Sequence, residues 1–394
     1  MTDPVSRPPL LLAARLAVAV VLLAVAGSAW AGPGVAVSGS AYVDYWWIQN
    51  RPIGKASPEG VTVEGSLKVG VDVSDDLSFS AKACFSCHGI EMEHAYFDFQ
   101  PKTWFNVQMG RLAIPFGEYA ERVDPSGHRT VSAPLIYDMG RMVAGGRSAM
   151  NLGVVPLPYT DTGVLAYGIA WLGEHLQAWY GGYAVAGMKG TNDIDWMSMR
   201  GLPYTDNNRL PAGGGRVTLA YSAEPGAFLG DSSIGASYTA GRYDKDVRLG
   251  YKAWAADATV RLGRITIRGE YAQRKTDLDP TVTGYRYVMV DDWFRKDGYY
   301  AELEHPLGKY LGAVYRLDQL RRSGVPLPSS ASYMTLDTRI TRYTAGLLIT
   351  PAQAIYVKLG YEYWTPNDVG VFRTPPASAF PAFHSAHVGL GGAF

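Results

Sequence analysis

Two cysteines and a histidine stand together in the segment Cys84-Phe85-Ser86-Cys87-His88. They are the only two cysteines among the 394 residues of the sequence. Cys-x-x-Cys-His is the attachment signature of a c-type haem. Thiols at this spacing add across the two vinyl groups of the porphyrin, and the adjacent imidazole ligates the iron. We therefore predict one covalent haem c on Cys84 and Cys87, with His88 as an iron ligand.

Two other interpretations of this motif remain open. Cys84 and Cys87 could form a disulfide that staples a hairpin, since disulfides persist in oxidising compartments. A zinc site would use both cysteines with His88 or His94. Structural zinc sites usually add a second cysteine pair or a spaced histidine pair, which this sequence does not supply.

The first 31 residues predict an export signal. Arg7 and Arg15 give its positive flank, residues 16–26 its apolar core, and Ala29-Trp30-Ala31 its cleavage site. The mature chain is then expected to be residues 32–394. Export suits the motif, because c-type haem is attached after translocation. Beyond the signal there is no run of 18 apolar residues, so no membrane helix is predicted.

The composition favours a membrane barrel over a soluble enzyme. The sequence has 45 Gly, 26 Tyr and 10 Trp, and its 36 basic residues balance its 36 acidic residues. A balanced charge argues against a nucleic-acid partner, which needs a basic face. Many glycines and aromatic residues with middling hydropathy suit a chain of short strands that is apolar outside and polar inside.

Period-two alternation from Ser38 onward predicts strands of about nine to thirteen residues. The clearest is 355–363, in which apolar side chains alternate with Lys358, Gly360 and Glu362. The same pattern recurs in 265–271, 299–304 and 342–349. Because no helical segments are available to cover so many apolar faces, lipid is the more economical cover.

The connections between these strands alternate between tight turns and long polar loops. The short ones are 74–76, 101–103, 173–174, 262–264, 306–309 and 351–352. The long ones are 49–60, 117–161, 187–214, 275–296, 321–336 and 366–381. This alternation is the rule for outer-membrane barrels and gives about sixteen strands. We therefore predict an all-β, transmembrane, antiparallel β-barrel in the outer membrane of a Gram-negative cell.

Two segments carry a family resemblance. The C-terminal Phe394 resembles the signal by which bacterial outer-membrane proteins reach their insertion machinery. Residues 109–117, Met-Gly-Arg-Leu-Ala-Ile-Pro-Phe-Gly, resemble a segment of phosphate-selective-type porins. The resemblance implies outer-membrane lipid around the barrel, small solutes or ions in its lumen, and a homo-trimer. The charged residues expected in the lumen are Lys82, Arg268, Arg316, Arg342, Lys358, Glu270, Glu302 and Glu362.

The second axial ligand of the predicted haem is expected from a distant part of the chain. Met92 and His94 follow the motif too closely to wrap around to the far face of the ring. His128 lies in the long loop after the fifth strand, which in porins commonly folds into the lumen, so we predict His128 as the second metal ligand. The alternatives on the same segment are Met139, Met142 and Met150.

The motif comes at the outer end of the third strand. Alternation puts Lys82 and Cys84 in the lumen, and the strand is expected to break at or just after Cys84 so that both thiols reach one porphyrin edge. The haem would then sit at the cell-exterior mouth of the barrel.

These features predict an electron-transfer protein more than a catalyst. The chain resembles cytochrome–porin fusions, although their haem motif precedes the barrel, and it resembles porin–cytochrome conduits. Both imply electron transfer across the outer membrane to or from an external donor or acceptor, with periplasmic or extracellular cytochromes as partners. The alternative function is a passive solute-diffusion porin in which Cys84–Cys87 is a structural disulfide.

Overall fold

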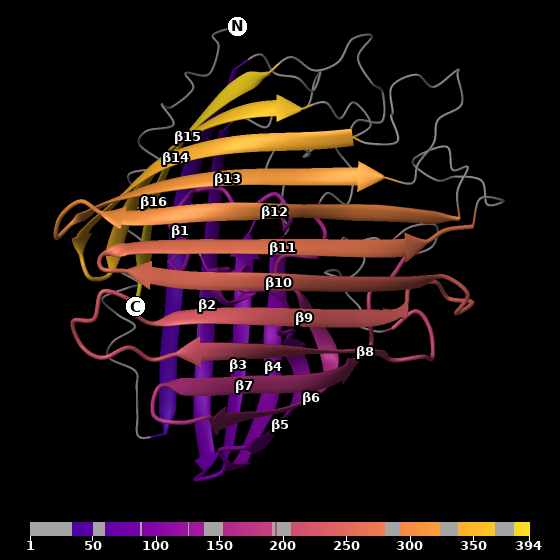
Figure 1. Ribbon diagram of the computed structural model, residues 1–394. Coiled ribbons are helices and arrows are strands. Elements are labelled where there is room, and N and C mark those ends of the chain that lie inside the picture. Colours follow the sequence, from indigo (N-terminus) through magenta and orange to yellow (C-terminus); the bar gives the residue numbers. More distant parts are fainter. Residues whose placement is uncertain are drawn as a thin grey trace, which may run out of the picture.

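The computed structural model of this chain is a closed antiparallel barrel of 16 strands (Figure 1). It describes residues 34–49, 60–86, 89–124, 126–137, 153–190, 194, 206–279, 292–323, 338–366 and 382–394. The predicted signal peptide, residues 1–31, lies outside these ranges. Among the described residues, no helix is long and apolar enough to cross a membrane.

Each strand pairs with its neighbours in the sequence, and β1 pairs with β16 to close the sheet. The first eight strands are β1 Val35–Ile48, β2 Gly60–Ser74, β3 Leu77–Ser86, β4 Gly89–Lys102, β5 Phe105–Ala113, β6 Thr160–Trp171, β7 Leu176–Val185 and β8 Ala212–Tyr221. The others are β9 Ser232–Arg242, β10 Gly250–Leu262, β11 Ile265–Asp277, β12 Trp293–Pro306, β13 Leu311–Ser323, β14 Thr338–Ala352, β15 Ile355–Pro366 and β16 Phe383–Ala393. A short 3-10 helix, η1, covers Tyr119–Arg122. The prediction of about sixteen antiparallel strands is confirmed.

Closure matters because no strand edge is left without a hydrogen-bonding partner. In a lipid environment each unsatisfied backbone group costs several kcal/mol, so a spanning sheet has to close on itself. The last residue takes part in this closure: Phe394 N donates to Gly39 O at 2.9 Å, and Gly39 N donates to Phe394 O at 3.0 Å.

The alternation of the strands separates an apolar outside from a polar inside. Large apolar side chains exposed on the outside include Val61, Val63, Leu67, Phe97, Phe99, Met109, Ile234, Tyr315, Tyr343, Leu347, Leu359, Tyr361, Val388 and Leu390. Of the predicted lumenal charges, Lys82, Arg316, Arg342, Lys358, Glu270, Glu302 and Glu362 are buried, and Arg268 takes part in lumenal ion pairs. The predicted direction of these side chains is confirmed.

The two ends of the barrel differ. One end carries the short turns and the C-terminus, as the left side of Figure 1 shows, and is called the turn end. Gly263 makes one of these turns with φ +57°, a left-handed conformation that favours glycine. The other end, the loop end, carries the long connections. In outer-membrane barrels the short turns face the periplasm.

Candidate functional site: the lumen and its inserted loop

The described parts of the connection between β5 and β6, residues 114–124, 126–137 and 153–159, enter the barrel and are called the inserted loop. Gly117 has φ +74°, and a Cβ there would collide with the side chains of Tyr137 and Glu270. The N–H of Gly117 donates to Ser237 Oγ at 3.1 Å, and that of Tyr119 donates to Glu270 Oε2 at 3.3 Å. The prediction that this loop folds into the lumen is confirmed.

The next part of the inserted loop is held by charged side chains of the wall. Arg316 Nη1 donates to Thr130 Oγ1 at 2.7 Å and to Ser132 O at 3.0 Å. The Leu135 N–H donates to Asp318 Oδ1 at 3.1 Å. Without Asp318 the Leu135 N–H would be buried without a partner, a situation that costs about 1–3 kcal/mol.

The same wall carries a network of ion pairs. Arg316 pairs with Asp318 at 2.9 Å and with Glu302 at 3.6 Å. Arg342 pairs with Asp318 at 3.1 Å and with Glu362 at 3.4 Å. All five side chains are at most 1% exposed. Buried charges are tolerated only when they are paired and hydrogen-bonded, as here.

The inserted loop also brings apolar side chains into the barrel. Phe116, Leu135, Ile136 and Val154 are completely buried, and Tyr137 is 1% exposed. Their burial away from lipid means that the loop packs its own small hydrophobic core inside the lumen. The lumenal face of β9–β15, to which this loop is fixed, is called the covered wall.

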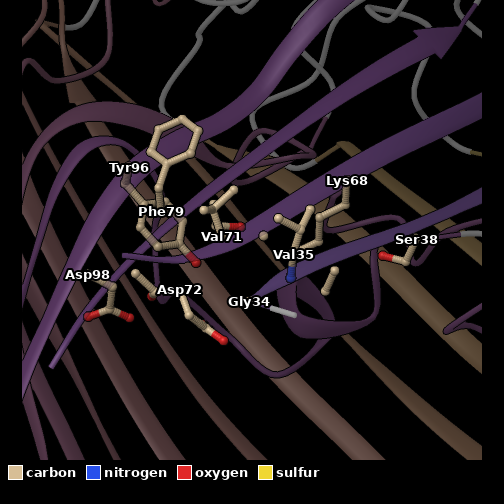
Figure 2. Close-up of a pocket in the computed structure, with 13 residues that line it drawn as sticks. Gly34, Val35, Ser38, Lys68, Val71, Asp72, Phe79, Tyr96 and Asp98 are labelled. Atoms are coloured by element: carbon tan, nitrogen blue, oxygen red, sulfur yellow. The ribbon is translucent and has the colours of Figure 1, made fainter. Parts of the chain in front are cut away.

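The lumenal face of β1–β7 near the turn end, called the open wall, contains a cavity of about 440 Å³ (Figure 2). The cavity exists because small residues occupy adjacent register positions: Ala36 faces Gly70, which faces Ser80. The next position on β4 is Tyr96, whose ring lines the cavity. Asp98 also lines it, as Figure 2 shows.

Asp98 connects this cavity to an aromatic pair further along the open wall. Its carboxylate accepts hydrogen bonds from Gln100 at 2.8 Å, Gln108 at 2.9 Å and Tyr167 at 3.0 Å. The Tyr167 ring stacks with that of Trp179, with centroids 6.3 Å apart and planes at 26°. Neither Asp98 nor the aromatic pair was among the residues predicted from the sequence to form a site. The sequence did contain a signal for this pair: the two-residue alternation of β6 and β7 places both rings on the inward face.

Cys84, the first residue of the predicted haem motif, faces the lumen as predicted. Its thiol is free and donates to Glu93 Oε2 at 2.7 Å. Glu93 also pairs with Lys82 at 2.9 Å, and Lys82 pairs with Asp124 of the inserted loop at 2.6 Å. The inserted loop therefore reaches the wall that carries the motif.

The expected break of the strand at Cys84 is not observed. The ladder between β3 and β4 continues to the pair Ser86–Gly89, and the irregularity lies instead in β4. There Glu93 is the extra residue of a bulge, so that both Glu93 and His94 turn inward and are buried. The motif nevertheless lies at the loop end of β3, as predicted. Cys87 and His88 lie outside the described residues.

His128, the predicted distal ligand, is buried in the inserted loop. Its Nδ1 lies 2.6 Å from Thr130 O and 3.3 Å from Lys358 Nζ. Burial and the neighbouring ammonium of Lys358 hold the pKa of His128 well below its ordinary value of 6.5. His128 contacts Lys358 of β15, whereas Cys84 contacts Glu93 of β4, so the two side chains are directed to different strands.

The alternative distal ligands are distributed differently. Met92 is 42% exposed and pairs with Ala83, on the outward face of the sheet. His94 faces inward, with Nε2 3.2 Å from Ser80 Oγ. Met139, Met142 and Met150 lie outside the described residues. Among the described residues, no group of three or more histidine, cysteine or carboxylate side chains is arranged to hold a metal ion.

No family model and no curated protein matches the sequence, but solved structures match the fold. An anion-selective porin from Comamonas acidovorans is 13% identical, with a TM-score of 0.57 over 91% of this chain and 99% of that chain. OmpF of Salmonella typhi, solved with daunomycin, is 12% identical, with a TM-score of 0.57 over 91% and 97%. The trimer form of OmpT from Vibrio cholerae is 9% identical, with a TM-score of 0.50 over 91% and 99%.

These comparisons and the barrel itself define the fold class. The chain has the 16-stranded barrel fold of outer-membrane porins. Its outside is apolar on every side of a closed sheet, which requires lipid as the surrounding solvent. The predicted outer-membrane barrel is thus confirmed.

Proposed function

We propose that this protein is a passive porin of the outer membrane that lets small hydrophilic solutes and ions diffuse through a lumen narrowed by the inserted loop. The observation that carries the proposal is the unequal filling of the lumen. The loop packs on the covered wall with its own core, while the open wall keeps polar side chains around a cavity. A fixed constriction beside a polar path is what a diffusion pore needs.

The similar structures support this proposal through their stated functions. One is described as an anion-selective porin, and another is an outer-membrane protein in a trimer form. We propose that this chain likewise passes solutes and assembles as a homo-trimer.

The constriction can be tested by loosening the inserted loop. Purified protein in a planar lipid bilayer should give steady, voltage-independent unit conductance in KCl. Glu270→Ala removes the acceptor for the Glu118 and Tyr119 N–H groups and for the Tyr137 hydroxyl. We expect this variant to change the unit conductance and to add current noise.

Ile267→Ala is the matched control, because Ile267 lies on the same strand and is 40% exposed on the outside. It should leave the conductance unchanged. A wild-type protein that inserts and folds but conducts no current would overturn the proposal.

We also propose, separately, that Cys84, Cys87 and His88 carry a covalent haem c, which would extend the function to electron transfer. What supports it is the motif together with a free, lumen-facing thiol at Cys84, close to the loop end of β3. A haem at this end could exchange electrons with an external donor or acceptor or with a partner cytochrome.

The haem proposal has a direct test. Expressed with the haem-attachment machinery, the wild-type protein should stain for haem peroxidase after denaturing electrophoresis, because only thioether-bound haem survives. Cys84→Ser/Cys87→Ser should fold and conduct but fail to stain. A colourless wild type would leave only the passive pore.

A further inference from the structure

We propose that the open wall holds a binding track for neutral, polyhydroxylated solutes of the saccharide class, made of the Trp179–Tyr167 aromatic pair, Asp98 and the cavity beside Tyr96. The inference deepens the proposed pore function and rests on it. It concerns which solute the lumen recognises, and its first observation is the orientation of the Trp179 ring.

The Trp179 ring lies along the wall over a glycine. A Cβ on Gly181, two residues further on β7, would lie 2.8 Å from Trp179 Cη2 and 3.3 Å from Cζ2. The absence of a side chain at Gly181 therefore leaves room for the indole to lie along the strand. The Tyr167 ring of β6 lies nearly parallel to it. Both rings are partly exposed to the lumen. Together they form an apolar ledge in a polar wall.

A ring that lies along the wall offers its face to a ligand. Aromatic faces are apolar and carry a partial negative charge, so they attract the weakly positive C–H groups of a flat partner. A pyranose ring presents such C–H groups on one face and hydroxyl groups around its rim. A ligand of this kind could stack on the ledge and still reach polar groups beside it.

Asp98 supplies the polar groups at the edge of the ledge. Its Oδ2 accepts from both glutamine side chains, Gln100 and Gln108, and the Tyr167 hydroxyl lies 3.0 Å from both Oδ1 and Oδ2, so Oδ1 has the single donor Tyr167. A carboxylate has about four acceptor positions. Oδ1 therefore keeps the capacity to accept a ligand hydroxyl. Each glutamine fixes the carboxylate with its amide N–H and leaves its own carbonyl oxygen as an acceptor.

The cavity continues the track from Asp98 toward β1. Its volume of about 440 Å³ lies in the range of small-molecule sites, about 300–1,000 Å³. Its lining alternates hydroxyl groups with charges of both signs: Ser38, Ser78, Ser80, Lys68, Asp72 and Asp98. Hydroxyl groups both donate and accept, which matches the hydroxyls of a saccharide.

This chemistry favours a neutral ligand over other small solutes. Lys68 stands among the cavity residues with two carboxylates, so neither an anion nor a cation meets charges of one sign only. A purely apolar solute would displace water from the serines and carboxylates of the cavity without offering hydrogen bonds in its place. A solute with an apolar face and a hydroxyl rim satisfies both halves of the track.

The test uses maltose as the probe and the ion current in KCl as the readout. For the wild type we expect a saturable decrease of current with maltose concentration. Trp179→Ala should raise the half-blocking concentration about tenfold, since it removes the stacking face, and Asp98→Asn should raise it severalfold. Trp179→Phe should restore most of the binding. All variants should keep the heat-modifiable migration of a folded barrel.

Tyr180→Ala is the matched control, because Tyr180 follows Trp179 on β7, points to the outward face of the sheet and is 37% exposed. It should leave the maltose block unchanged. Polyethylene glycol of the same hydrodynamic size should reduce the current without saturating. The track is overturned if maltose acts like this polymer, or if Trp179→Ala and Tyr180→Ala behave alike. A wild type without any current counts against the pore itself, whereas a conducting wild type without saturable block counts only against the track.

Discussion

The strands of the covered wall and of the open wall alternate apolar and polar side chains in the same way. Their polar side chains nevertheless differ in burial and in pairing. On the covered wall, Glu302 and Arg316 are buried and bind each other and the inserted loop. On the open wall, Lys68 is exposed at the edge of a cavity. The covered wall is in effect a folded polar core, and the open wall is a surface.

The difference teaches that a lumenal charge has no fixed role until its partner is known. Against the inserted loop, a charge is desolvated and must be paired. Its removal therefore leaves its former partner as a buried charge without a counter-charge. Against an open lumen, a charge stays hydrated and contributes to the field that a solute meets. The following changes separate the two situations.

The largest effect is expected from Arg316→Ala on the covered wall. This change deprives Asp318 and Glu302 of an ion-pair partner and removes the hydrogen bonds that Arg316 donates to Thr130 Oγ1 and Ser132 O. We expect a loss of about 3 kcal/mol in the free energy of unfolding, in line with breaking a buried pair by removing one partner. Urea unfolding of the barrel in detergent, followed by tryptophan fluorescence, measures it.

Lys68→Ala on the open wall is the comparison for this change. Because Lys68 is exposed, its loss should alter the unfolding free energy by no more than about 0.5 kcal/mol, as is usual for surface positions. Equal losses for the two variants would show that the open wall is also a folded core.

A smaller and pH-dependent effect is expected at His128, where the inserted loop meets β15. Burial and Lys358 lower the pKa of His128 in the folded state, so the docked loop holds a neutral imidazole. Its contribution to docking is complete above the ordinary value of 6.5 and is lost as the pH falls below it, because the released histidine then binds a proton that the docked one does not. Protease cleavage of the inserted loop should therefore become faster as the pH is lowered from 7.5 to 5.

His128→Gln should make this cleavage less dependent on pH, since glutamine does not titrate. His175→Gln serves as the control, because the His175 side chain is 42% exposed near a turn, away from the loop. If the wild type and His128→Gln show the same pH profile of cleavage, the titration of His128 does not control the docking of the loop.

The sequence predicted more of the fold than of the site. Alternation, tight turns and long connections predicted the strand number, the closure and the direction of Lys82, Glu302 and Arg342. They did so because a strand in lipid obeys a strict two-residue period and cannot leave an edge unpaired. The same rules placed Cys84 in the lumen at the loop end of β3.

What only the tertiary structure decided is which residues meet across the lumen. The bulge at Glu93 has no signature in a single sequence. It interrupts the two-residue period and brings the Glu93 carboxylate toward Cys84 and Lys82. The seating of Trp179 over Gly181 and its stacking on Tyr167 depend on the register between β6 and β7. The sequence by itself determined which side chains face inward, because that is a local property of each strand. The division into a covered and an open wall depends on where a distant loop docks, and that is set by contacts between residues more than a hundred positions apart, such as Leu135 with Asp318.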